Sequence, residues 1–146
     1  MNSSKILITG AAGFIGYHLC KSLLEDGYEV LGIDNLNNYY DINLKQARLE
    51  QLKQFKSFLF NKVDIADRES LTKSFQSFNP QKIVNLAAQP GVRYSIKNPY
   101  AYINSNLVGF LNIIELCRNN EVRSFVYASS SSVYGGNKKM TFSVED

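Results

Sequence analysis

The sequence predicts an α/β domain built on a doubly wound parallel sheet. Short apolar runs of strand length alternate with amphipathic runs of helix length along the 146 residues, and the first apolar run passes directly into a glycine-rich turn. Strands that alternate with helices indicate parallel pairing with right-handed crossovers. We therefore expect the strand order 3-2-1-4-5, a sheet truncated after the fifth strand, and a ligand across the carboxyl ends of strands one and four.

The first strand is expected at residues 6–8 and leads into the glycines of KILITGAAGFIG. Gly10 permits a tight turn, Gly13 lets a phosphate approach the main chain, and Gly16 lets the following helix pack against the strand. The positive end of that helix suits a pyrophosphate. Glycines alone also fit an ordinary strand–helix turn, but an acid follows them, and this favours a dinucleotide site. The apolar side of the helix is expected to carry Phe14, Ile15, Leu19, Leu23 and Leu24.

Asp34 is the acid that closes the second apolar run, residues 29–33, where a second parallel strand should end beside the first. A carboxylate at this place can accept both hydroxyls of an adenosine ribose, and it repels a 2′-phosphate. No arginine follows directly, since the next residues are Asn35, Leu36, Asn37 and Asn38. The pattern predicts NAD as the cofactor and not NADP. The alternative is that Asp34 only caps the next helix.

Three further helices are expected, over residues 41–55, over residues 68–78 and after Pro99. Each has apolar residues at helical spacing. The third, fourth and fifth strands are expected at residues 58–63, 82–86 and 124–128. The apolar residues of these helices are Ile42, Leu44, Leu49 and Leu52 in the first, Leu71, Phe75 and Phe78 on one face of the second, and Ile113, Ile114 and Leu116 in the third.

Composition and charge exclude several classes of protein. Hydrophobic residues make up 45% of the chain, which excludes a disordered protein. The net charge is only +3 with scattered basic residues, so no nucleic-acid partner is expected. The N-terminal MNSSKILITG has too short an apolar stretch for a signal peptide and no run approaches a membrane span, so we expect a cytoplasmic location. His18, Cys20 and Cys117 show no metal-ligand spacing, and no metal is expected.

These motifs together resemble the extended short-chain dehydrogenase/reductase family of NAD-dependent epimerases and dehydratases. The resemblance rests on TGAAGFIG, on Asp34, on Asp64–Ile65 after the third strand, on NLAAQ after the fourth and on SSSSVYG after the fifth. Within that family the chain looks most like the UDP-glucuronate 4-epimerases. The runs that indicate this group are DNLNNYYDINLKQARLEQL, AAQPGVRYSIKNPYAYINSNLVGFLNIIE and YASSSSVYGGNKK.

The resemblance implies an NAD-binding Rossmann domain over residues 1–146 and assigns roles to its residues. The glycine turn would hold the pyrophosphate, Asp34 and Asn35 the adenosine ribose, and Asp64 and Ile65 the adenine. Ser105 stands where many relatives have a cofactor-contacting asparagine, and Asn106 is the alternative. The cofactor-binding residues implied are Gly10, Gly13, Phe14, Ile15, Gly16, Asp34, Asn35, Asp64, Ile65, Leu86, Ala87, Ala88, Gln89 and Ser105.

The serine run is where the family places its catalytic Ser or Thr. The resemblance implies that Ser130 hydrogen-bonds the C4 oxygen of the sugar, with Ser132 as a second candidate, whereas the residues alone also fit a strand-end turn. Tyr134 and Lys138 match the motif YxxxK, whose two residues should lie on one face of a helix. Two glycines follow Tyr134, and glycine has a low helix propensity, so this pair is not expected to be the catalytic one. The family's catalytic Tyr and Lys lie further on, past Asp146.

The resemblance implies NAD-dependent epimerisation of a UDP-sugar at C4, from UDP-glucuronate to UDP-galacturonate through a transient 4-keto sugar. Arg93 of GVRYS would pair with the sugar carboxylate; a phosphate-binding or a structural role is the alternative. The function could also be that of another nucleotide-sugar epimerase, dehydratase or decarboxylase of the family, or of a non-catalytic dinucleotide-binding fragment. We expect a truncated chain that lacks the substrate domain and is inactive alone, and a homodimer at full length.

Overall fold

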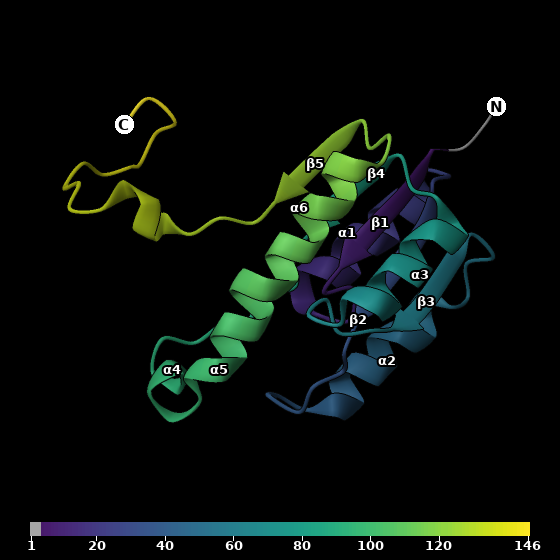
Figure 1. The fold of residues 1–146 in the computed structure, drawn as a ribbon, viewed down its shortest axis with the longest axis horizontal. Coiled ribbons are helices and arrows are strands. Elements are labelled where there is room, and N and C mark those ends of the chain that lie inside the picture. The colour runs from purple at the N-terminus through teal and green to yellow at the C-terminus, as the bar shows by residue number, and fades with distance from the viewer. Residues whose placement is uncertain (1–3) are drawn as a thin grey trace.

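The computed structural model describes residues 4–146, so the first three residues of MNSSKILITG lie outside the described residues. Its strands form one parallel sheet in the order β3-β2-β1-β4-β5, which confirms the predicted topology (Figure 1). The register pairs Thr9 with both Ile33 and Asn85, so the carboxyl ends of three strands meet at one edge. The strands are β1 (Lys5–Thr9), β2 (Glu29–Asp34), β3 (Phe58–Lys62), β4 (Lys82–Asn85) and β5 (Ser124–Tyr127).

Helices cover both faces of the sheet. A π-helical segment, η1 (Ile103–Gly109), continues without a break from α5 into α6. A 3-10 turn, η2 (Ser131–Tyr134), follows β5. The helix bounds are α1 (Phe14–Glu25), α2 (Ile42–Leu52), α3 (Arg68–Phe78), α4 (Tyr94–Lys97), α5 (Pro99–Tyr102) and α6 (Phe110–Asn119). The sequence predicts α3 with its observed bounds, but neither α4 nor the π-helical segment.

The central strand β1 divides the core into two layers. Ile6 and Ile8 pack with the buried residues of α1 and α2, whereas Leu7 packs with those of α3 and α6. Successive side chains of a strand point to opposite faces, and a parallel strand is buried on both. The apolar run of β1 is therefore continuous because it supplies both layers.

The buried face of α1 differs from the prediction, and α2 also exposes two of its apolar residues. Phe14 and Ile15 are 66% and 64% exposed, because Gly16, Tyr17, Cys20 and Leu24 occupy the face of α1 against the sheet. In α2, Ile42 and Leu44 are exposed, and the buried face consists of Lys45, Leu49 and Leu52. Apolar identity alone does not give the rotation of a helix about its own axis. The rotation of α2 places Lys45 on the buried face and Leu44 outside it.

The segment after β5 leaves the body of the molecule as turns and the short η2 (Figure 1). Within residues 4–146, no helix has the length and apolar character needed to cross a membrane.

The packing of α1 on the turn that precedes it generates a stability prediction. A Cβ at Gly16 would overlap the carbonyl oxygen of Gly10, which is backbone and cannot move aside cheaply. We expect Gly16→Ala to lower the free energy of unfolding by about 1–3 kcal/mol, the usual cost of overpacking. Urea denaturation followed by circular dichroism measures this change.

Gly136→Ala is the matched control, because nothing lies within 4 Å of a Cβ placed there. Its free energy of unfolding should equal that of the unchanged chain. Equal stability of the Gly16→Ala variant would show that the helix is not pressed against the turn.

Candidate functional site

Two clefts meet at the carboxyl edge of the sheet. The first, of about 610 Å³, lies over the ends of β1, β2 and β3, and the second, of about 780 Å³, lies over the ends of β4 and β5. They share Leu86, Ala87 and Ala88, the residues that follow β4. Ligands of open α/β sheets bind where the strand order reverses, here between β1 and β4. The two clefts therefore form one groove across this point.

The first cleft brings together most of the predicted cofactor residues. Phe14, Ile15 and Gly16 lie outside its lining among the described residues, at the start of α1. The predicted residues that line it are Gly10, Gly13, Asp34, Asn35, Asp64, Ile65, Leu86, Ala87, Ala88, Gln89 and Ser105.

The glycine turn brings three segments of backbone together. Gly10 has a φ of +70°, and a Cβ there would lie 2.9 Å from the backbone nitrogen of Ala87. Gly13 precedes α1, whose first turn has neither a capping side chain nor an acidic residue. The first N–H groups of a helix have no intrahelical partner, and such an end binds anions. The cradle at the start of α1 therefore fits a phosphate group.

Asp34 ends β2 at the wall of the first cleft and is 8% exposed. Its Oδ2 accepts a hydrogen bond from Ala12 N at 3.2 Å, and its Oδ1 accepts one from Leu36 N at 2.9 Å. The alternative role as a helix cap is wrong, because Asp41 caps α2 by accepting from Asn43 N. An ionised carboxylate has about four acceptor positions, so Asp34 retains acceptor capacity for a diol.

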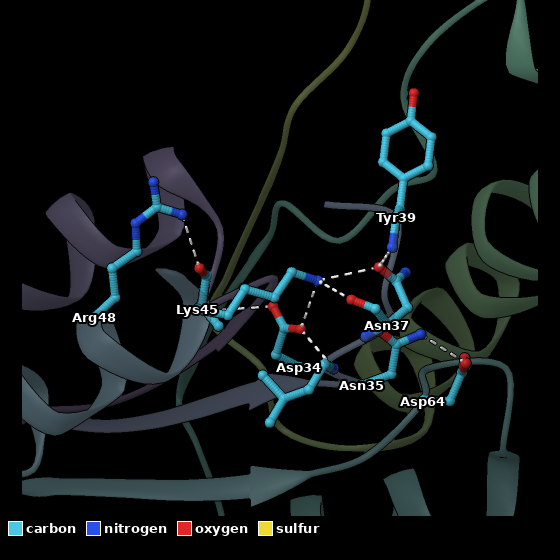
Figure 2. Close-up of polar contacts among 9 residues, drawn as sticks. Asp34, Asn35, Asn37, Tyr39, Lys45, Arg48 and Asp64 are labelled. Carbon is cyan, nitrogen blue, oxygen red and sulfur yellow. Dashed lines mark hydrogen bonds and ion pairs between the residues drawn. The ribbon is translucent and has the colours of Figure 1, made fainter. Parts of the chain in front are cut away.

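Lys45 is a residue of this site that the sequence prediction missed. Its Nζ lies 3.7 Å from Asp34 Oδ1 and donates to the backbone oxygen and to Oδ1 of Asn37, each at 3.1 Å (Figure 2). The side chain is buried and lines the first cleft. Its spacing to Leu49 and Leu52, four and then three residues, is the signal that could have placed it on the buried face of α2.

Asp64 joins the ends of β2 and β3. Its Oδ2 accepts from the Asn35 side chain and its Oδ1 from Ala66 N, both at 2.9 Å. The neighbouring Ile65 is buried beneath Gly109, where a Cβ would overlap the Ile65 side chain. This end of the cleft therefore combines fixed carboxylate acceptors with apolar surface, which suits an aromatic amine.

A buried side-chain pair joins β1 to β4, and the sequence prediction missed it as well. The Thr9 hydroxyl donates to Asn85 Oδ1 at 2.6 Å and accepts from Leu86 N and Ala87 N at 3.2 and 3.0 Å. Both side chains are buried. The pair fixes the start of the wall that the two clefts share.

The π-helical segment η1 places consecutive residues in different clefts. Ser105 lines the first cleft, and Asn106 lines the second. Asn106 also holds the loop after β4: its Oδ1 accepts from Gln89 N at 2.8 Å and its Nδ2 donates to Gln89 O at 3.1 Å. π-Helical turns occur often at functional sites. Ser105 and Asn106, the two alternatives for one cofactor contact, thus both lie at the groove but line different clefts.

Tyrosine rings tie the loop before α2 to the loop after β4. Tyr39 and Tyr94 lie 5.0 Å apart between ring centroids, and Tyr94 and Tyr102 lie 6.4 Å apart. The Tyr102 hydroxyl donates to Pro90 O at 2.9 Å. Tyr39 and Pro90 both line the first cleft, so these contacts limit its width.

The serine run lies at the second cleft. Ser130 lines it, and its Oγ accepts from Ser132 N and lies 3.1 Å from Ser132 Oγ. Ser132 lies outside the described lining, in η2. The ring of Tyr134 stacks on Phe142 with centroids 4.4 Å apart.

Arg93 is exposed at the start of α4, outside the described linings of both clefts. Within residues 4–146 no ion pair or hydrogen bond holds its guanidinium, which is therefore available to a ligand.

Comparison with known proteins finds a matching family model and relatives of similar sequence. The family model for GDP-mannose 4,6 dehydratase matches residues 7–146. The chain is 51% identical over 142 residues to protein CapI of Staphylococcus aureus, covering 97% of this chain and 42% of that protein. It is 44% identical over 130 residues to the UDP-glucuronate 4-epimerase of Thermodesulfobacterium geofontis, covering 89% of this chain and 40% of that protein.

A solved structure has a similar fold. The crystal structure of UDP-glucuronic acid 4-epimerase from Bacillus cereus, in complex with UDP-glucuronic acid and NAD, superposes with a TM-score of 0.85 and 36% identity. The match covers 97% of this chain and 44% of that one. The chain thus spans about two fifths of the length of the relatives that it matches.

The buried pair between β1 and β4 generates the second prediction. Thr9→Val removes a hydroxyl that serves Asn85, Leu86 and Ala87, and it leaves their buried polar groups without that partner. We expect the free energy of unfolding to fall by about 1–3 kcal/mol. Urea denaturation measures it, with Thr9→Ser as the control that keeps the hydroxyl. If Thr9→Val is as stable as the unchanged chain, the hydroxyl does not stabilise this pair.

Proposed function

Because the chain belongs to the GDP-mannose 4,6 dehydratase family of NAD-dependent epimerases and dehydratases, we propose that its groove binds NAD and a UDP-sugar. The proposed reaction is epimerisation at C4, from UDP-glucuronate to UDP-galacturonate through a transient 4-keto sugar. The observation that carries the proposal is the division of one groove by the loop after β4. One side has the features of an adenosine and pyrophosphate site, and the other side has the serine run.

The residues of the first cleft fit the adenosine half of NAD. The bare start of α1 behind Gly13 would hold the pyrophosphate, and Asp34 and Asn35 would hold the ribose. Asp64 would accept from the adenine amino group, with Ile65 beside the ring. The remaining half would pass over Ala87 into the second cleft. Bound NAD supplies a hydride acceptor and donor for C4 of the sugar.

The residues of the second cleft fit a sugar whose C4 oxygen gains and loses a proton. Ser130 has a hydroxyl at this cleft, and that hydroxyl would hydrogen-bond the C4 oxygen and hold it in place. We assign the general base to a Tyr–Lys pair. In the relatives of this chain, that pair would lie in the region that the 146 residues do not cover. Ser132 stays the second candidate for the hydroxyl role. We also propose that the full-length protein forms a homodimer and is located in the cytoplasm.

A binding and turnover experiment tests this proposal. The 146-residue chain should bind NAD in a calorimetric titration but should not convert UDP-glucuronate. A longer protein that carries this chain and the Tyr–Lys segment should convert it, because a general base contributes about 10²–10⁴-fold to the rate. Chromatographic separation of the two uronates measures turnover.

Tyr134→Phe is the control in the longer protein, and its rate should be unchanged, since that ring stacks on Phe142. Turnover by the 146-residue chain at the rate of the longer protein would contradict the assignment of the base. Absence of NAD binding would contradict the proposed function as a whole.

The exposed guanidinium of Arg93 generates a prediction about substrate choice. If it pairs with the sugar carboxylate, Arg93→Ala in the longer protein should lower kcat/KM for UDP-glucuronate by about ten- to hundred-fold. The value for UDP-glucose should change little, because that sugar has no carboxylate. Lys97→Ala removes an exposed charge of the same short helix and is the matched control. A uniform loss for both sugars would instead assign Arg93 to a phosphate or to the fold.

A further inference from the structure

The pair of Asp34 and Lys45 changes the electrostatics of the ribose site. The two residues are 8% and 5% exposed, and Lys45 Nζ lies 3.7 Å from Asp34 Oδ1. Lysine and aspartate are almost never fully buried unless they are paired. The carboxylate that would face the adenosine ribose is therefore one member of an ion pair, and the net charge of that pair is close to zero. Simple repulsion of a 2′-phosphate by Asp34 does not describe this site.

The ammonium group of Lys45 is fixed at the wall of the cleft. Two oxygens of Asn37 accept from it at 3.1 Å each, and the Tyr40 ring lies beneath it at 5.2 Å from the centroid. An ammonium has three donors, so one remains for the side where Asp34 lies. Figure 2 shows Nζ between Asn37 and Asp34, at the end of β2. Asp34 and a ligand phosphate would compete for this remaining donor.

A second cation lies one turn further along α2. Arg48 donates to the backbone oxygen of Ala12 at 3.1 Å, and its guanidinium lies 5.8 Å from the Phe14 ring centroid. Ala12 N donates to Asp34, so the arginine reaches the same turn that holds the carboxylate (Figure 2). Arg48 lies outside the described lining of the cleft, so it adds positive charge behind this turn, whereas Lys45 lines the cleft itself. Asp34 is the carboxylate that pairs with Lys45 there.

We propose that Lys45, together with Asp34, decides which nicotinamide dinucleotide binds. While the carboxylate engages Lys45, a 2′-phosphate must displace a partner that the fold already holds in place, so a free 2′-hydroxyl is preferred. Without the carboxylate, Lys45 becomes a ligand for a 2′-phosphate. The inference rests on the proposed function, because it requires an adenosine ribose at Asp34.

A double-mutant cycle tests this role by binding alone. The variants are Asp34→Asn, Lys45→Met and the pair together, and the probes are NAD, 5′-AMP and adenosine 2′,5′-bisphosphate, titrated by calorimetry. The last two probes differ only in the 2′-phosphate. In Asp34→Asn, the affinity for the bisphosphate should rise about ten- to hundred-fold, the factor of one charge-assisted hydrogen bond. In the double variant, the gain should disappear.

Controls separate a specific contact from net charge and from folding. Lys53→Met removes an exposed positive charge at the end of α2, and combined with Asp34→Asn it should leave the gain intact. Asp34→Ser is the second variant if Asp34→Asn unfolds, as judged by thermal melting.

A gain that survives in the double variant overturns the role of Lys45. The role of Lys45 is also overturned if the wild-type chain binds NAD but no Asp34 variant gains affinity for the bisphosphate. A wild-type chain that binds neither NAD nor 5′-AMP overturns the proposed function, and the inference with it.

Discussion

The close approach of three backbone segments at Gly10 is the constraint on which the site depends. The turn after β1, the first turn of α1 and the loop after β4 meet there without room for side chains at Gly10 or Gly16. This contact sets the angle at which α1 leaves the sheet and brings its uncapped end to the groove. It also places Leu86 and Ala87 against the turn, so that one wall serves both clefts. Side chains in other parts of the two clefts define the contacts to a ligand, but the backbone at Gly10 defines the shape of the groove.

Buried polar pairs then hold the edge of the sheet in one arrangement. Thr9 holds Asn85 and the start of the β4 loop, and Asn106 holds Gln89 further along that loop. Within residues 4–146, no buried side-chain nitrogen or oxygen lacks a hydrogen-bond partner. In a low-dielectric interior an unsatisfied polar group is costly, so a fully satisfied network is rigid. The groove is therefore largely formed before any ligand enters it.

The two halves of the groove differ in how completely this chain builds them. The first cleft, which we propose for the adenosine half, has the buried carboxylate of Asp34, the half-buried carboxylate of Asp64, a buried lysine and tyrosine contacts across its mouth. The second cleft is lined by strand ends and by exposed Ser129 and Ser130, and the Ser130 hydroxyl bonds to that of Ser132 outside the described lining. Ligand affinity should thus depend mainly on the first half. Under the proposed function, the position of the sugar would also depend on the Tyr–Lys pair that we assign to the longer protein.

The sequence by itself determined the order of the strands, the glycine turn and the place of Asp34 at a strand end. These features follow from local patterns: apolar runs, helical spacing, and a turn geometry that favours glycine. Tertiary structure alone decided that Phe14 and Ile15 are exposed, that Lys45 is buried beside Asp34, and that Asn106 holds Gln89. The physical reason is that the rotation of a helix, and the partner of a buried polar group, depend on segments far away in the chain. Thr9 and Asn85, which are 76 positions apart, become neighbours only when β1 and β4 pair.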